Sequence, residues 1–183
     1  RYLGAFYEDL DDFGKAADHL LAGIALEPEN VDLQFRLGIV YDKWGRKAES
    51  IAAMKKVIAL DPENAGALNY LGYTYADMGI NLEEAEQLVL KALEHKPDDG
   101  YITDSLGWVY FKMGLFEKAL KYLKKAVELV PDDPIILEHL GDAYQKTQNA
   151  EKALELYKRS MENKQDDKTE LERKIRDLSE QGS

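Results

Sequence analysis

Apolar and polar residues follow each other in this chain with helical spacing, and the pattern recurs at a fixed interval. A leucine followed by a glycine and, three residues later, by a tyrosine occurs at Leu3-Gly4…Tyr7, Leu37-Gly38…Tyr41, Leu71-Gly72…Tyr75, Leu106-Gly107…Tyr110 and Leu140-Gly141…Tyr144. Successive glycines of this motif are 34, 34, 35 and 34 residues apart. A period of this size is typical of stacked helical hairpins and is not expected from one globular core.

Two kinds of break divide each repeat into a pair of helices. Proline ends one helix because it lacks the backbone N–H and clashes with the preceding turn, and it recurs at Pro28, Pro62, Pro97 and Pro131. Residues suited to N-cap the next helix follow it, namely Asn30, Asn64, Asp99 and Asp133. A glycine marks the second break at Gly45, Gly79 and Gly114. We therefore expect two helices of about 12 to 14 residues in each repeat, joined by short turns.

The motif glycine predicts close packing of the two helices of a repeat. It carries no side chain, so the second helix can approach it and interdigitate. In the predicted second helices a small residue recurs as Ala16, Ser50, Ala85, Ala119 and Ala153. A larger residue follows it at helical spacing as Leu20, Met54, Val89, Leu123 and Tyr157.

These motif, alanine and proline positions resemble the tetratricopeptide repeat (TPR) family over residues 1–167. The resemblance implies an all-α fold, a right-handed α-solenoid of about five helix-turn-helix repeats with a C-terminal capping helix. The expected units are 1–30 (N-terminally truncated), 31–64, 65–99, 100–133 and 134–167, followed by a capping helix and tail in 168–183. An extra residue near Gly79–Leu82 accounts for the 35-residue spacing and should alter that turn.

The end of the chain predicts one further helix. Leu171, Ile175 and Leu178 fall on one of its faces and charged residues on the others, as in a cap that closes a solenoid. A helix that awaits a partner chain is the alternative. The sequence begins at Arg1 inside a repeat, so we expect it to be the C-terminal part of a longer protein.

Composition narrows the possible partners. The net charge of −11 opposes binding to nucleic acid or to an anionic membrane, because phosphate groups would be repelled. The chain has no cysteine, which excludes disulfides and cysteine-based metal sites. No apolar stretch approaches the ~18 residues of a membrane-spanning helix, so we expect no direct membrane insertion.

The resemblance also implies that the first helix of each repeat lines a concave groove. The groove candidates are Phe35, Ile39, Asp42, Asn69, Tyr73, Asp77, Tyr101, Asp104, Trp108, Phe111, Glu138, Asp142 and Lys146. Tyr73 and Trp108 directly follow motif glycines, and we expect them to be exposed aromatic anchors for a ligand. The alternative is that they pack between neighbouring repeats.

The groove chemistry indicates the type of partner. Some TPR domains bind acidic chaperone tails through lysines, asparagines and an arginine, and only Asn69 matches that set here. Phe35, Asp104 and Glu138 have the wrong chemistry for it. The groove is instead aromatic in the middle and acidic toward its C-terminal end, which suits an apolar segment with basic flanks.

Catalytic and metal-binding patterns are not specific in this sequence. The three histidines fall at unrelated repeat positions. His139 with Glu138 and Asp142 could be imagined as a metal site, but we interpret these residues as scattered surface polarity. Trp44, beside a hairpin turn, is interpreted as filling a local gap. We therefore expect no enzyme activity, no cofactor and no metal.

The leading hypothesis is a non-catalytic protein–protein interaction scaffold that binds a peptide or helix in its groove. The alternatives are a structural element that self-assembles through its terminal repeats, and a regulatory array attached to a catalytic domain before Arg1. The segment from Asn69 to Trp108 also resembles repeat domains of bacterial outer-membrane-associated lipoproteins and adaptors. That resemblance implies the periplasm, with the cytoplasm as the alternative.

Overall fold

The computed structural model describes residues 12–165 and 167–181, which form helices joined by short turns and no strand. The helices are α2 (Phe13–Leu26), α3 (Val31–Lys43), α4 (Lys47–Leu60), α5 (Ala65–Met78), α6 (Leu82–His95), α7 (Gly100–Lys112), α8 (Phe116–Leu129), α9 (Pro134–Lys146), α10 (Ala150–Asn163) and α11 (Thr169–Gln181). None of these described helices is long and apolar enough to cross a membrane. The first copy of the motif, with Leu3, Gly4 and Tyr7, lies outside the described residues.

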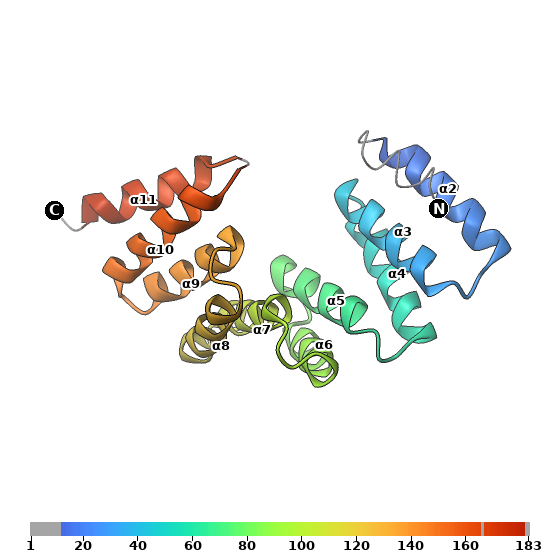
Figure 1. Cartoon of the computed structure of the whole chain (residues 1–183), viewed down its shortest axis with the longest axis horizontal. Coiled ribbons are helices and arrows are strands. Elements are labelled where there is room, and N and C mark those ends of the chain that lie inside the picture. The colour runs from blue at the N-terminus through green and yellow to red at the C-terminus, as the bar shows by residue number, and fades with distance from the viewer. Residues whose placement is uncertain (1–11, 166, 182–183) are drawn as a thin grey trace.

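The helices stack as successive hairpins along a bent array whose two ends lie far apart (Figure 1). We call α3, α5, α7 and α9 the first helices and α4, α6, α8 and α10 the second helices of their repeats. Each first helix packs on the hairpin before it, as α7 does on α5 and α6. In Figure 1, α6 and α8 lie on the outer side of the bend. The expected all-helical solenoid is confirmed.

The turns form where the sequence places its breaks. The side-chain oxygens of Asn30, Asn64, Asp99 and Asp133 accept backbone N–H bonds in the first turns of α3, α5, α7 and α9. Inside each repeat, the carbonyl of the motif tyrosine accepts the N–H that closes the turn, at 2.8 Å from Arg46 to Tyr41 and 3.0 Å from Ile80 to Tyr75. The motif tyrosine therefore contributes its backbone as well as its ring.

The extra residue of the third repeat is accommodated in the turn between α5 and α6. Gly79 has a left-handed backbone with φ of 68°, and Asn81 adopts a second left-handed conformation with φ of 48°. The equivalent turns contain one such residue each, namely Gly45, Gly114 and, between α9 and α10, Gln148. The insertion thus changes the turn, and α5 has 14 residues where α3, α7 and α9 have 13.

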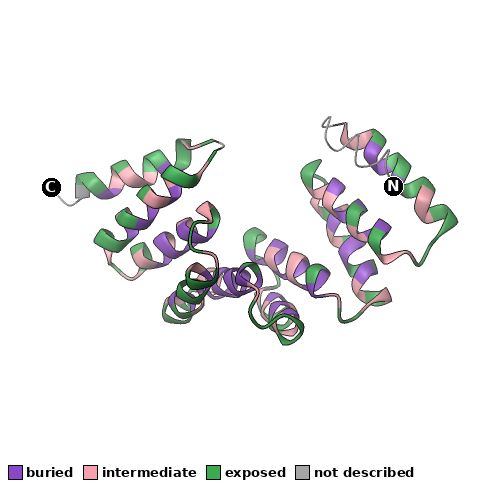
Figure 2. Cartoon of the chain, viewed as in Figure 1, coloured by how far each residue is buried: buried purple, intermediate pink, exposed green. Residues whose placement is uncertain are grey.

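The motif glycines lie against the large residues that the sequence pairs with them. A Cβ atom at Gly38 would be 2.6 Å from Met54 Cε, and one at Gly107 would be 2.6 Å from Leu123 Cγ. A Cβ atom at Gly72 or at Gly141 would likewise be 2.5 Å from the side chain of Val89 or of Tyr157, respectively. Buried residues consequently form stripes where helices face each other (Figure 2).

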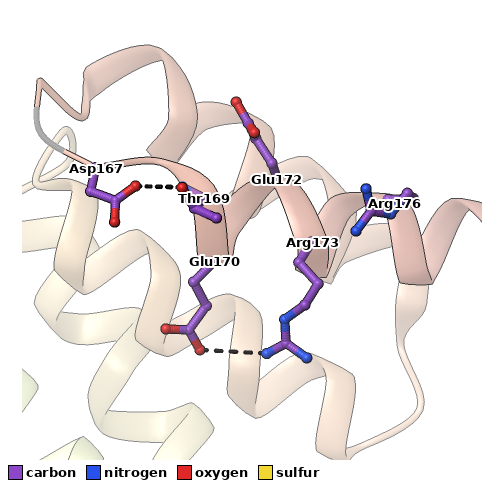
Figure 3. Close-up of a pocket in the computed structure, with 6 residues that line it drawn as sticks. All are labelled: Asp167, Thr169, Glu170, Glu172, Arg173 and Arg176. Atoms are coloured by element: carbon purple, nitrogen blue, oxygen red, sulfur yellow. Dashed lines mark hydrogen bonds and ion pairs between the residues drawn. The ribbon is translucent and has the colours of Figure 1, made fainter.

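Helix α11 covers the C-terminal end of the array. Leu171 and Leu178 are buried with Ala153 and Tyr157 of α10. The outer face of α11 is polar and includes Glu170, Glu172, Arg173 and Arg176 (Figure 3). This arrangement is that of a capping helix, because a partner chain would find the apolar stripe already covered.

Replacing Gly107 by alanine is expected to destabilise the fold. The new methyl group would overlap the fully buried Leu123, whose Cγ and backbone nitrogen atoms would lie 2.6 and 3.1 Å from the added Cβ. Overpacking of this kind costs about 1–3 kcal/mol, more than the ~1 kcal/mol gained in helix propensity. Gly14→Ala is the matched control, since its Cβ would lie 3.7 Å from Trp44 in ordinary contact. Urea unfolding should show a lower free energy of unfolding for Gly107→Ala and an unchanged one for Gly14→Ala. Equal free energies for the two variants would contradict the packing argument.

Candidate functional site

Each first helix carries two residues, one turn apart, that face the next repeat; we call them the inner pair. The inner pairs are Phe35/Ile39, Asn69/Tyr73, Asp104/Trp108 and Glu138/Asp142. We call the residue just before the motif leucine of the following repeat the incoming residue, because in most repeats it contacts the inner pair. The incoming residues are Tyr70, Ser105 and His139, and in α11 Lys174 holds the equivalent position.

The inner pair of α7 is closed by His139. Its Nδ1 atom lies 3.0 Å from both carboxylate oxygens of Asp104. Its ring stacks on Trp108 with centroids 4.1 Å apart, and Trp108 also stacks on Phe111 at 4.8 Å. Trp108 is therefore only 9% exposed, and the expectation of an exposed ring at this position is wrong.

His139 is a residue whose role sequence reasoning missed. It is 7% exposed and paired with a carboxylate, so the interpretation as scattered surface polarity is wrong. The sequence did contain a signal for its burial. His139 comes directly before Leu140, at a helix position that packs on the preceding repeat. Asp104 lies 35 residues earlier, about one repeat away.

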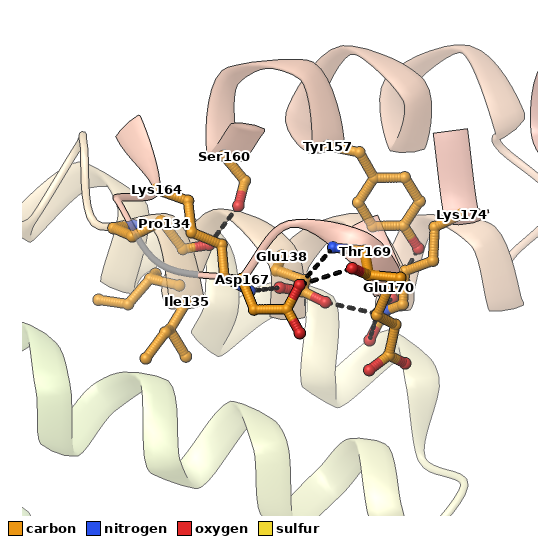
Figure 4. A network of polar contacts seen from close by, with 12 residues as sticks. Pro134, Ile135, Glu138, Tyr157, Ser160, Lys164, Asp167, Thr169, Glu170 and Lys174 are labelled. Atoms are coloured by element: carbon orange, nitrogen blue, oxygen red, sulfur yellow. Dashed lines mark hydrogen bonds and ion pairs between the residues drawn. The ribbon is translucent and has the colours of Figure 1, made fainter. Parts of the chain in front are cut away.

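The inner pair of α9 is closed by Lys174 of α11. Its Nζ atom is 2.8 Å from Glu138 Oε1 and 2.7 Å from Asp142 Oδ1 (Figure 4). Lys164 lies 3.5 Å from the other Glu138 oxygen, and the hydroxyl of Tyr157 donates to Asp142 at 2.6 Å. The acidic residues expected at the C-terminal end of the groove are thus paired with basic groups of the same chain.

Opposing effects set the protonation of this cluster. Burial raises the pKa of Glu138. The hydrogen bonds and charges of Lys174 and Lys164 lower it by more, so the pKa of Glu138 lies below the usual 4.5. Burial lowers the pKa of Lys174, while Asp142 and Glu138 raise it above the usual 10.5. Glu138 and Lys174 are therefore both charged at neutral pH, and each charge stabilises the other.

We call the surface formed by the four inner pairs the inner face. At its N-terminal end, the incoming residue contacts the inner pair through an aromatic ring. The incoming residue Tyr70 meets Phe35 edge-to-face, with ring centroids 6.4 Å apart. Phe35 and Ile39 are both partly buried against the core. Burial, followed by the nearby Asp42, raises the pKa of Tyr70, so its hydroxyl stays neutral.

The inner pair of α5 differs from the others because its incoming residue does not reach it. The hydroxyl of Ser105 donates to the carbonyl of Tyr101 in its own helix at 3.0 Å. Asn69 Oδ1 is buried without a hydrogen-bond partner, and in the described residues this holds otherwise only for Ser50 Oγ and Trp108 Nε1. Buried polar atoms without partners are rare, and each calls for an explanation.

Tyr73, the other member of this pair, is half-buried at the centre of the inner face. Its ring centroid is 6.3 Å from that of His139, across the intervening helix α7. Burial raises the pKa of Tyr73 to about 12, with further contributions from Asp77, Asp104, Asp42 and Glu138. The charges of four carboxylates, one from each first helix, thus add to the effect of burial, and the phenol of Tyr73 stays neutral at neutral pH.

The structure divides the candidates expected from the sequence into two groups. Asp42, Asp104, Trp108, Glu138 and Asp142 are engaged by the chain itself, and Phe111 supports Trp108. The candidates with accessible surface are Phe35, Ile39, Asn69 and Tyr73, which are partly buried, and Asp77, Tyr101 and Lys146, which are exposed. The described residues contain no group of three or more side chains placed to hold a metal ion.

Models of known repeats match most of this array. Tetratricopeptide repeat models match residues 31–64, 53–87 and 136–171, and a model described as a TPR repeat matches 107–148. This chain belongs to the tetratricopeptide repeat family. TPR proteins generally mediate protein–protein interactions, and the family and fold are typical of scaffolds without catalysis.

Individual relatives agree with this assignment. A TPR repeat-containing protein of Pseudomonas aeruginosa is 37% identical over 113 residues, which make up 62% of this chain and 19% of the relative. The matched part is thus about one fifth of that protein.

Solved TPR structures share the fold at low identity. A thermophilic TPR protein of Thermus thermophilus gives a TM-score of 0.78 at 21% identity, covering 97% of this chain and 95% of its own. PilF of Pseudomonas aeruginosa gives a TM-score of 0.77 at 21% identity, covering 98% of this chain and 85% of its own. MamA of Desulfovibrio magneticus RS-1 gives a TM-score of 0.76 at 20% identity, covering 88% of this chain and 91% of its own.

Lys174→Met should destabilise this TPR array at neutral pH. It leaves Glu138 and Asp142, whose side chains are 16% and 15% exposed, without their shared cation. Loss of a charged hydrogen bond at such a site costs about 1–3 kcal/mol. Arg173→Met is the matched control, because its ion pair with Glu170 is exposed and should contribute less than about 0.5 kcal/mol.

The same pair of variants gives a pH test. The pKa of Glu138 is lowered in the fold, so its stabilisation is present above 4.5 and is lost as the pH falls through the folded value. The pKa of Lys174 is raised, so its contribution is lost only when the pH rises above 10.5. Thermal melts should therefore show a smaller acid-induced loss in Lys174→Met than in the Arg173→Met control, and parallel curves would contradict the assignment.

Proposed function

We propose that this chain is a non-catalytic adaptor that holds a segment of a partner protein against the inner face around α5, with Tyr73 as the anchor. Tyr73 carries the proposal because it is the half-buried aromatic at the centre of the inner face, next to His139, where the charges of four carboxylates act on it. A rigid aromatic ring of this kind can bury ~150–250 Å² against a ligand.

Trp108 has a supporting role in this proposal. It is enclosed between His139 and Phe111, and its exposed area is too small for an anchor. The Asp104–His139 pair fixes His139 in place next to Tyr73. The platform under Tyr73 is therefore rigid before a ligand arrives, which reduces the entropy lost on binding.

The surroundings of Tyr73 suggest how the partner segment lies. Asn69 and Asp77 are one turn before and one turn after it on the same face of α5. The half-buried Phe35 and Ile39 of α3 offer apolar surface on one side, and the exposed Tyr101 of α7 lies on the other. The exposed Asp77 and the net charge of −11 favour an apolar segment with basic flanks.

Tyr73→Ala should weaken binding of the natural partner by about tenfold or more, because central aromatic anchors contribute about 2 kcal/mol. The partner is first captured from lysate of the source cells and then titrated calorimetrically against each variant. Trp44→Ala is the matched control, since Trp44 is exposed at the α3–α4 turn, outside the inner pairs. Equal affinities of wild type and Tyr73→Ala, with unchanged melting temperature, would rule out the inner-face assignment.

A further inference from the structure

In three of the four inner pairs the incoming residue matches the chemistry of the pair. Acidic pairs receive a basic group: His139 contacts Asp104 at 3.0 Å, and Lys174 contacts Glu138 at 2.8 Å. The apolar pair of α3 receives the ring of Tyr70. In each case the incoming side chain fills the space beside two residues that are one helical turn apart.

The pair Asn69/Tyr73 is the exception. Ser105 is short and buried, and its hydroxyl is bonded to Tyr101 within α7. The oxygen of Asn69 consequently lacks the donor that the equivalent oxygens of Asp104 and Glu138 receive. A buried acceptor without a donor destabilises the fold, so a ligand that supplies a donor to Asn69 is favoured.

We propose that Asn69 and Tyr73 form a binding site for one lysine or arginine side chain of the partner segment, in the place that His139 and Lys174 occupy in the following repeats. This inference rests on the proposed function and specifies the chemistry that the same site recognises.

The contacts of Lys174 show how such a side chain can be held. Its ammonium group bridges two residues of α9, Glu138 and Asp142, and lies 5.4 Å from the ring centroid of Tyr157. Asn69 and Tyr73 have the same one-turn spacing on α5. Rotation of the half-buried Asn69 side chain presents its oxygen to the cation, and the ring of Tyr73 adds a cation–π contact.

Charge also favours a basic occupant. Among the four carboxylates around Tyr73, Asp42 pairs with Lys47, Asp104 with His139, and Glu138 with Lys174. Asp77 is exposed and forms no ion pair with any described residue. An acidic ligand would be repelled by this surface, and an apolar one would leave the oxygen of Asn69 unsatisfied.

The test uses a library of random peptides displayed on phage and selected on the wild-type chain. Selected peptides should be enriched in lysine or arginine relative to the unselected library. Replacement of that residue by methionine should weaken binding at least about tenfold in fluorescence titrations, as expected for loss of a charged hydrogen bond and a cation–π contact.

Two variants of the chain test the site directly. Ser105→Lys supplies a basic incoming residue from within the chain and should abolish peptide binding without lowering the melting temperature. Asn69→Leu removes the acceptor and should abolish the preference for the basic peptide over its methionine version, which keeps the test valid if Ser105→Lys does not fold. Trp44→Ala is the control and should bind like wild type.

The outcomes separate this inference from the proposed function. Peptides that need Tyr73 but bind equally well with methionine in place of the basic residue would overturn the inference and leave the adaptor function standing. Peptides whose binding is indifferent to Tyr73→Ala would overturn both. Retention of full affinity by Ser105→Lys would also exclude the proposed site.

Discussion

The contact between each motif glycine and the large residue of the second helix determines the geometry of the whole array. At Gly107 the two helices approach so closely that a single methyl group would overlap Leu123. This approach fixes the angle and the separation of the two helices within each repeat. Because the contact recurs in every described repeat, successive hairpins share one shape, and the residue before each motif leucine recurs at the same position of its helix.

Different side chains on this constant geometry give the inner face its functional pattern. The C-terminal part is closed, since His139 and Lys174 bind the carboxylates in front of them. In the middle, Ser105 bonds within its own helix, and the oxygen of Asn69 has no hydrogen-bond partner. A region already fixed by contacts within the chain, next to an unmet acceptor, favours binding because little of the protein must become ordered when a partner arrives.

The sequence predicts the fold well because its determinants are local and periodic. Proline, glycine and the capping residues set the helix ends, and the spacing of small and large residues identifies the packed faces, as Gly38 with Met54 illustrates. The state of the candidate site was less predictable. Helical spacing shows that Trp108 points away from the hairpin core, but its burial depends on His139, a residue of the next repeat. Likewise, the acidity of Glu138 and Asp142 was visible in the sequence, whereas their pairing with Lys174 depends on where α11 docks.

The match between incoming residues and inner pairs also has a consequence for how such an array can grow. Its repeats share one backbone geometry but are not interchangeable, because each junction carries its own side-chain complement. Duplication of the third repeat, for example, would bring a second Tyr70 against Asn69, and exchange of the last two would separate Asp104 from His139. The side-chain contacts between neighbouring repeats therefore depend on the order of the repeats. An inserted repeat that preserves the 34-residue period can still disrupt these contacts on the inner face.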